Sequence, residues 1–320
     1  MSSLQSLSLA KKLLLGILAV SLVALGLSFA GAYQVFHSRF EAQKVSDLEM
    51  YARERTRTEQ SLFTQLSARY AGATREMIDR YESMEPEATW RELDRFFPLQ
   101  ADGTRRSIPE LYDGISDGAG GRIFGMAGFI PDAASMTGDE AKVILAAARI
   151  VFASGPSGFE TFDNFYFFTP QNRLVMFGPA REDRLIYYRR DAPPDFNFQH
   201  EEMSRLVRPE LNPAGVMQCT RLRRLISSPG TRRMSTGCYQ PVTIDGRQVG
   251  AWGVTIPVGD RLMRSVNDVP AGATGRIVSS QGQLIAWPGF TGLSEDEAEA
   301  FAAQAREKEL PTLMEQIHRT

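Results

Sequence analysis

Aromatic and arginine side chains on strand-like segments are the residues of this sequence best suited to bind a small molecule. Rings supply apolar contact area and guanidinium groups bind carboxylates, so the set predicts a site for a small anionic or neutral ligand. On a strand, Tyr187 and Arg189 would share one face and Tyr188 and Arg190 the other. The alternative is that the aromatic side chains form core and the arginines its rim. The set comprises Tyr166, Phe168, Arg184, Tyr187, Tyr188, Arg189, Arg190 and Trp252.

Catalytic and metal-binding motifs are absent from the sequence. His37, His200 and His318 stand far apart, which argues against a histidine-built metal site. His200 and the two glutamates after it lack the Arg and Pro of a phosphoacceptor box, so a solvated helix start is favoured. Residues 121–125 (GRIFG) lack the Lys-Ser/Thr of a phosphate loop, and neither Gly-x-Ser-x-Gly nor His-Glu-x-x-His occurs. We therefore expect no catalytic residue, no metal and no cofactor within these 320 residues.

The two cysteines predict a disulfide. Cys219 and Cys238 flank Ser227-Ser228-Pro229-Gly230, and a four-residue loop there would pair strand residues whose numbers sum to 457. That register sets the two cysteines directly opposite each other, within bonding reach. A turn centred on Pro-Gly would shift the register by two and leave two buried thiols as the alternative.

The N-terminal segment predicts a membrane anchor. Residues 13–33 carry no charge and reach about 31 Å as a helix, roughly the hydrocarbon thickness of a bilayer. Lys11 and Lys12 precede this segment, so residues 1–12 are expected in the cytoplasm and the bulk of the chain outside it, in the oxidising compartment of a bacterium. A cleaved signal peptide is the alternative, since Ala30-Gly31-Ala32 has the small-x-small form.

A long helix follows the anchor. Residues 35–84 contain no proline and one glycine, and apolar residues from Leu62 to Tyr81 keep a helical spacing. We assign residues 34–89 to this stalk. It is either a solvated spacer or a helix that pairs with a second copy of the chain, and we expect a homodimer through it.

Residues 90–267 carry the pattern of an α+β domain. Thr137 and Glu140 form a capping box before an apolar helix, and Gly155 is a plausible end for it. Strand-like runs follow at residues 164–169, 173–177, 184–189, 220–226, 232–236, 238–244 and 248–256. Pro170-Gln171-Asn172 and Asp245-Gly246 predict two hairpins. A buried helix followed by antiparallel hairpins indicates an antiparallel sheet rather than a doubly wound one.

Residues 268–320 are too few for a stable domain of their own. A hairpin is predicted at residues 276–279 and 283–286 around Ser280-Gln281-Gly282, and a helix from Asp296 to Thr320, interrupted by Pro311. The region is either an appendage of the preceding domain or the opening of an incomplete module.

Two stretches resemble the double Cache (PAS-like) sensory regions of bacterial transmembrane receptors. Residues 237–242 (GCYQPV) and 244–254 (IDGRQVGAWGV) are similar to the family's small residue, Pro, strand, Asp-Gly-x-x-x-Gly run. Residues 275–278 and 282–288 are similar to the opening of its membrane-proximal module. The amino-acid-binding members have an Asp where this chain has Thr255, and their Arg-x-Trp-Tyr element is missing.

The resemblance implies a membrane-distal Cache-like domain at 90–267 and an incomplete membrane-proximal module at 268–320. It also implies a membrane-anchored periplasmic sensor whose output module, beyond residue 320, is most often a histidine kinase and less often a diguanylate cyclase or chemoreceptor. A self-contained, membrane-tethered periplasmic enzyme or adaptor is the alternative, so enzyme activity stays open. A net charge of −2 argues against nucleic acid as a partner.

Overall fold

The structure, a computed structural model, describes residues 9–118, 120–158, 162–220, 223–224, 234–257, 264–270, 272–278 and 284–288. The chain divides into two units, Met1–Leu62 and Phe63–Thr320. Helix α1 (Leu9–Ser83) contributes to both. An 18-residue window near its N-terminal end has a mean hydropathy of 2.5, so the helix is long and apolar enough to cross a membrane.

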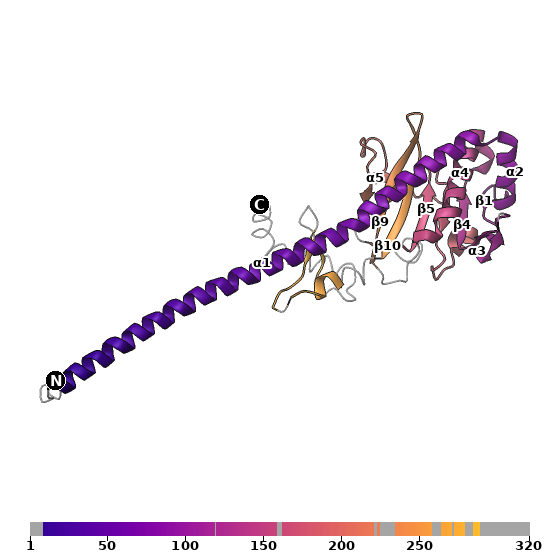
Figure 1. Ribbon diagram of the computed structural model, residues 1–320. Helices are drawn as coiled ribbons and strands as arrows, with labels where there is room; N and C mark the ends of the chain where they lie inside the picture. Colours follow the sequence, from indigo (N-terminus) through magenta and orange to yellow (C-terminus); the bar gives the residue numbers. More distant parts are fainter. Residues whose placement is uncertain are drawn as a thin grey trace. The chain divides into compact units, whose positions relative to one another are not determined.

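The second unit is built on an antiparallel sheet (Figure 1). Among the described residues the strand order is β1-β4-β6-β5-β10-β9-β7, with β8 also paired to β9. The strands are β1 (Arg105–Arg106), β4 (Met126–Ile130), β5 (Asn164–Phe168), β6 (Leu174–Phe177), β7 (Gln218–Cys219), β8 (Arg223–Arg224), β9 (Met234–Ile244) and β10 (Arg247–Pro257). The remaining elements are α2 (Pro86–Phe96), α3 (Glu110–Asp113), β2 (Ile115–Ser116), β3 (Arg122–Ile123), η1 (Ala133–Ser135), α4 (Gly138–Ser154), η2 (Pro156–Gly158), η3 (Tyr187–Asp191), α5 (Glu202–Leu206), β11 (Ile277–Val278) and β12 (Leu284–Ala286).

The predicted α+β class is confirmed, together with its local signals. The side chain of Thr137 accepts the backbone N–H of Glu140 and the Glu140 carboxylate accepts that of Thr137, so the capping box starts α4 as expected. The hairpin β5–β6 and the hairpin β9–β10 both form. In the second, Asp245 (φ 50°) and Gly246 (φ 75°) are both left-handed, which matches the right-handed twist of the flanking strands.

Other strand predictions need adjustment. Residues 234–244 form one continuous strand, β9, through Gly237, where two strands were expected. The pairing of β11 with β12 is antiparallel, as predicted for residues 276–286. Three predictions fall outside the described residues: the turns at Ser227–Gly230 and Ser280–Gly282, and the helix from Asp296 to Thr320.

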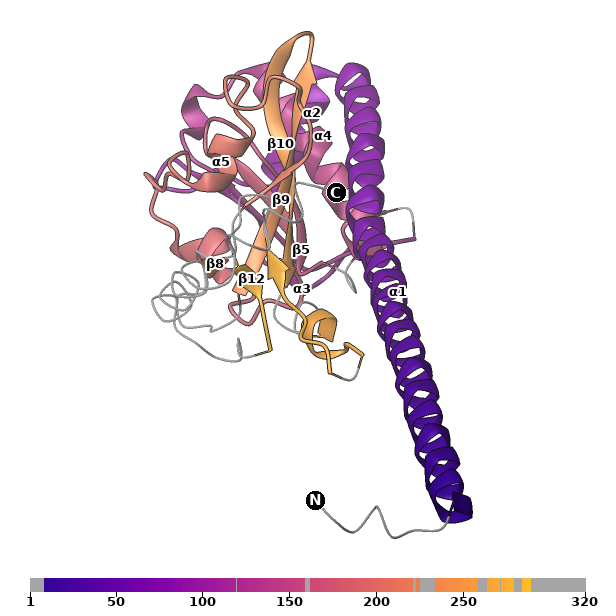
Figure 2. The ribbon, with the colours of Figure 1, turned by 90° about the vertical axis from the view of Figure 1, so that its left-hand side faces the viewer.

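The sheet has two covered faces (Figure 2). We call the face that contacts α4 and the C-terminal part of α1 the helix face. On it, Tyr70 of α1 stacks on Phe165 at 6.4 Å between ring centroids, and the Trp252 indole N–H donates to Thr74 Oγ1 at 3.0 Å. We call the opposite face the aromatic face, and the segment that contains η3 and α5 covers it.

Candidate functional site

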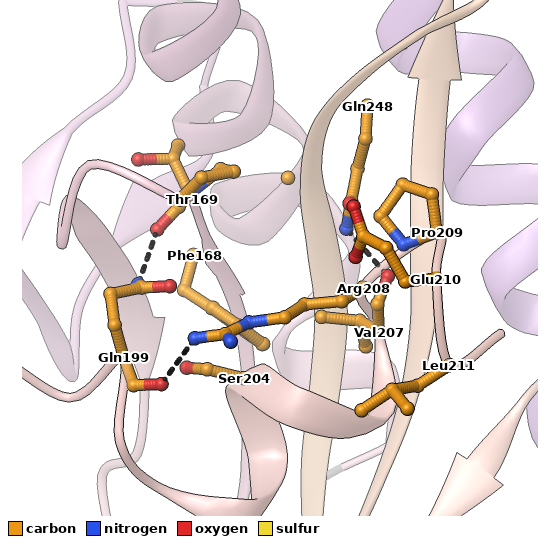
Figure 3. A pocket seen from close by; sticks show the side chains of 12 residues that line it. Phe168, Thr169, Gln199, Ser204, Val207, Arg208, Pro209, Glu210, Leu211 and Gln248 are labelled. Carbon is orange, nitrogen blue, oxygen red and sulfur yellow. Dashed lines mark hydrogen bonds between the residues drawn. The ribbon is translucent and has the colours of Figure 1, made fainter.

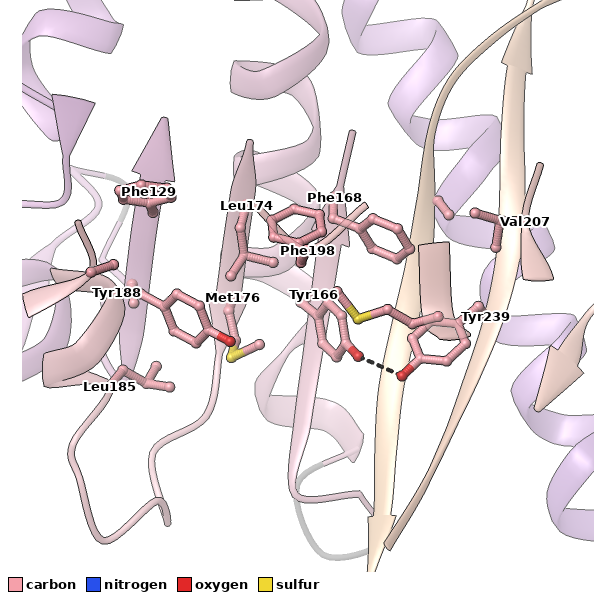
Figure 4. Close-up of a cluster of buried hydrophobic side chains, with 14 residues drawn as sticks. Phe129, Tyr166, Phe168, Leu174, Met176, Leu185, Tyr188, Phe198, Val207 and Tyr239 are labelled. Atoms are coloured by element: carbon pink, nitrogen blue, oxygen red, sulfur yellow. Dashed lines mark hydrogen bonds between the residues drawn. The ribbon is translucent and has the colours of Figure 1, made fainter. Parts of the chain in front are cut away.

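The aromatic face carries a continuous cluster of buried side chains (Figure 4). Strand alternation directs Tyr166 and Phe168 of β5 to this face, because Phe165 and Phe167 contact Trp252 on the other. Tyr187 is partly buried against the cluster. The structure thus brings together Tyr166, Phe168, Tyr187 and Tyr188 of the predicted set. The fully assembled cluster contains Ala127, Phe129, Tyr166, Phe168, Leu174, Met176, Leu185, Tyr188, Ala192, Phe198, Met203, Val207, Tyr239 and Ala251.

A pair of tyrosine hydroxyls supplies polarity inside this apolar cluster. Tyr166 Oη donates to Tyr239 Oη at 3.1 Å, and both side chains are buried. Burial raises the pKa of Tyr166 well above its usual value, and the neighbouring Tyr239 raises it further. The hydroxyl of Tyr166 therefore stays neutral at physiological pH and can donate or accept a hydrogen bond.

The segment of residues 184–191 is not a strand, so that prediction is wrong. Arg184 (φ 48°) and Leu185 (φ 55°) are left-handed, and Tyr187–Asp191 forms the π-helical turn η3. The sheet edge beside β4 is already occupied by β1, so this segment has no strand to pair with there and packs over the aromatic face instead. The alternation expected for residues 187–190 does not apply, because it holds only for an extended strand.

Buried Arg106 of β1 holds the segment in this conformation. Its guanidinium donates to the Ala192 carbonyl at 2.6 Å and to the Tyr188 carbonyl at 3.4 Å. Leu185 is fully buried in the cluster and anchors the other end of the turn. Two consecutive left-handed residues that are not glycine cost of order 1–3 kcal/mol each, and such strain persists where surrounding contacts overdetermine it.

Two of the predicted arginines converge on one ring at the rim of the aromatic face. The guanidinium carbons of Arg184 and Arg189 lie 5.2 Å and 4.7 Å from the centroid of the Tyr112 ring. Arg184 pairs with Asp113 at 2.6 Å, and Arg189 donates to the Arg184 carbonyl at 3.3 Å. Burial lowers the pKa of Arg189, while Asp113 raises it. Two guanidiniums thus face one carboxylate, which leaves a net positive rim.

The structure separates the remaining two predicted residues from this rim. Arg190 is exposed and pairs with its neighbour Asp191 at 2.7 Å. Trp252 is fully buried on the helix face, on the opposite side of the sheet from Tyr166. The sequence reasoning missed Tyr112, Leu185 and Tyr239. Tyr239 lies near Tyr166 because Gly253 of β10 pairs with both residues, a strand order that no local signal gives, and no local signal points to Tyr112 either.

The predicted disulfide between Cys219 and Cys238 is confirmed. The cysteines are directly opposite each other in the β7–β9 pairing, in the expected register. The register then changes by one, since Arg223 of β8 pairs with Ser235. The carbonyl of Cys238 also accepts a 2.6 Å hydrogen bond from the buried Tyr70 hydroxyl of α1. The disulfide-bearing strand is therefore bonded directly to the helix.

A groove with a volume of about 560 Å³ opens at the end of β5 and the start of β10 (Figure 3). We call it the α5 groove, because Ser204 of α5 and the turn after it form one wall. The sequence reasoning placed only Phe168 of its lining in a ligand site. The lining residues are Phe168, Thr169, Pro170, Gln199, Ser204, Val207, Arg208, Pro209, Glu210, Leu211, Gln248 and Gly250.

Comparisons with known proteins give structural likenesses alone. No protein-family model matches the sequence, and no curated protein matches it significantly. The solved ligand-binding domain of the Pseudomonas aeruginosa amino acid chemoreceptor PctC, in complex with GABA, aligns at a TM-score of 0.34 and 16% identity. The alignment covers 50% of this chain and 62% of the PctC chain.

Two further solved domains are similar to a comparable degree. The ligand-binding domain of the Pseudomonas fluorescens chemoreceptor CtaA, with L-serine, has a TM-score of 0.36 and 13% identity over 49% of this chain and 60% of that one. The domain of Campylobacter jejuni Tlp3, with L-norvaline, has a TM-score of 0.32 and 10% identity over 78% of each chain. The chain spans less than two thirds of the PctC and CtaA domains.

Proposed function

We propose that the chain is the membrane-anchored, periplasmic ligand-sensing region of a bacterial signal-transduction receptor. One observation carries the proposal. On its helix face, the sheet is hydrogen-bonded to α1 through Tyr70 and Trp252. On its other face, the same sheet carries the aromatic cluster, which the strained segment with Arg184 and Arg189 covers. A ligand on one face of this sheet therefore acts on strands that contact the helix.

The ligand proposed for the aromatic face is a small anionic or neutral molecule. Arg184 and Arg189 supply two guanidiniums beside Tyr112, and Asp113 neutralises one of them. A carboxylate of a ligand can replace Asp113 on Arg184, and a ligand ring or chain can pack against Tyr187, which is only partly buried. Such a contact favours one arrangement of the residue 184–191 segment over another, and only differential affinity of that kind shifts a conformational equilibrium.

The route to the helix is short because alternate residues of β5 face opposite layers. Tyr166 and Phe168 touch the aromatic cluster, while Phe165 stacks on both Tyr70 and Trp252. Any shift of β5 that a ligand induces is thus transmitted to α1 through closely packed rings. We propose that α1, as the stalk, pairs with a second copy and carries this shift to the membrane.

The receptor type is proposed from the sequence resemblance. A histidine kinase is the output we favour, with a chemoreceptor or a diguanylate cyclase as the alternative outputs; a self-contained membrane-tethered enzyme or adaptor is the second reading. We propose residues 90–267 as the membrane-distal sensory domain and residues 268–320 as part of a membrane-proximal module. The similar solved domains come from chemoreceptors.

A ligand screen on the full chain in lipid nanodiscs tests the proposal. We expect one or more organic acids or nucleobases to raise the thermal unfolding midpoint, and Arg189→Ala and Tyr187→Ala to weaken that binding about tenfold or more. Arg91→Ala, an exposed arginine on α2, is the matched control and should bind as the parent does. If ligands bind equally well to the Arg189 and Tyr187 variants, the proposed site is wrong.

A further inference from the structure

The α5 groove is a concave site on the second unit, apart from the arginine rim of the proposed function. Its volume of about 560 Å³ suits a small organic molecule rather than an ion. It lies at the end of β5 and the start of β10, whereas Arg184 and Arg189 meet at Tyr112 of α3. Phe168 and Val207 belong both to the aromatic cluster and to the groove lining.

Hydrogen bonds within the lining reveal which polar groups are left for a ligand. The amide nitrogen of Gln199 donates to the backbone carbonyl of Thr169 at 3.2 Å. The amide nitrogen of Gln248 donates to the backbone carbonyl of Val207 at 2.8 Å. The hydroxyl of buried Ser204 likewise donates to the carbonyl of Phe198. These bonds hold the walls together, and although each glutamine amide keeps a second N–H, none of these groups carries a charge that would attract an anion.

Arg208 is the strong donor that faces the groove. Its side chain crosses from the α5 wall to the opposite wall, where one guanidinium nitrogen donates to the Gln199 carbonyl at 2.7 Å (Figure 3). A guanidinium has five N–H groups, so most of its donor capacity remains for a ligand. The other charged lining residue is Glu210, which is exposed and carries the opposite sign.

Three apolar side chains of the lining, Phe168, Val207 and Leu211, offer contact area for the body of a ligand. Phe168 and Val207 are buried, and Leu211 adds an exposed aliphatic side chain at the mouth. One cation above an apolar floor fits a single carboxylate attached to an apolar body. A second carboxylate on the ligand would lack a cation within this lining and would be repelled by Glu210. A cationic amine would be repelled by the guanidinium of Arg208 and could pair only with the exposed Glu210.

We propose that the α5 groove binds an apolar monocarboxylate, with its carboxylate on Arg208 and its body against Phe168 and Leu211. Isothermal titration calorimetry on the full chain in nanodiscs tests the proposal. The four ligands are 3-phenylpropionate, its amine analogue phenethylamine, L-phenylalanine and succinate. These ligands differ in charge while three of them keep the same ring and chain length. We expect 3-phenylpropionate to bind most tightly.

Two variants locate the binding. Arg208→Gln removes the charge and keeps an amide near Gln199, and should weaken 3-phenylpropionate about tenfold or more. Arg205→Gln is the control, because Arg205 is exposed and follows Ser204 in the sequence but does not line the groove. This variant should leave the affinity unchanged. Thermal unfolding of both variants checks that they are folded.

Several results would overturn the proposal. Tighter binding of phenethylamine or L-phenylalanine would show that the site prefers an ammonium, and tighter binding of succinate would show a second cation. The absence of 3-phenylpropionate binding at millimolar concentration would equally reject it. Binding that survives Arg208→Gln but is lost in Arg189→Ala would move the ligand to the site of the proposed function, so the two proposals fail separately.

Discussion

Reduction of the Cys219–Cys238 disulfide should destabilise the second unit by a predictable amount. The cysteines are 19 residues apart in sequence, and closing a loop of that length removes unfolded-state entropy worth about 3 kcal/mol at 25 °C in the chain-entropy model. For a unit of this size, each kcal/mol moves the unfolding midpoint by roughly 2–4 °C. Reduction should therefore lower the midpoint by about 6–12 °C.

Thermal unfolding followed by circular dichroism, with and without dithiothreitol, measures the effect. Cys219→Ser is the better variant, because Cys219 is exposed and Cys238 is fully buried, so the change opens no cavity. The variant should unfold at the temperature of the reduced parent and should not respond to dithiothreitol. The sequence has no other cysteine that could obscure this comparison.

Three results would count against the reasoning. Equal midpoints for oxidised and reduced parent would show that the closed loop does not constrain the unfolded chain. Alkylation of both thiols in unreduced protein, detected by mass spectrometry, would show that the bond does not form in the expressed protein. A drop in the midpoint of Cys219→Ser on adding dithiothreitol would mean that the reductant acts elsewhere.

Three further predictions concern α1 and the buried tyrosines. Tyr70→Phe keeps the ring stacking but removes the bond to the Cys238 carbonyl, and should lower the free energy of unfolding by about 1–2 kcal/mol in urea titrations; no change would disprove a role for this bond. Burial raises the pKa of both Tyr70 and Tyr166, so the folded state holds these protons where the unfolded state releases them, and stability should fall as the pH rises above about 10. Urea titrations at pH 9 and 10.5 should show a smaller fall for Tyr166→Phe than for the parent, and an equal fall would contradict the assignment. Light scattering of the full chain in detergent should give a dimer mass that Leu48→Asp shifts toward the monomer, because an aspartate on an exposed apolar position of the stalk opposes pairing; a monomeric parent would contradict stalk pairing.

The features that the sequence predicted correctly depend on short-range chemistry. The capping box of Thr137 and Glu140 and the left-handed turn at Asp245-Gly246 involve residues three or fewer positions apart. Their conformational preferences hold in almost any fold. The disulfide needed a strand register as well, and the pairing of Cys219 with Cys238 follows once two strands on either side of a tight turn are assumed.

The conformation of residues 184–191 could not be predicted from the local sequence. The composition of this segment favours a strand, yet its conformation is set by Arg106, about 80 residues earlier, and by a sheet edge that β1 already occupies. β-Propensity is a measure of fit to a partly buried sheet surface, so it fails when no strand is available for pairing. Tyr112 joined the arginine rim for the same reason, through contacts distant in sequence.

The sequence by itself determined the long apolar N-terminal segment, the α+β class, the hairpins and the cysteine pair. The tertiary structure alone decided that Trp252 faces α1 while Tyr166 faces the aromatic cluster, because alternation separates two faces without telling which layer covers each. It alone decided the α5 groove, whose walls come from residues 168–170, 199–211 and 248–250. A concave site built from three distant segments has no local signal, since its shape arises only when the packed sheet brings those segments together.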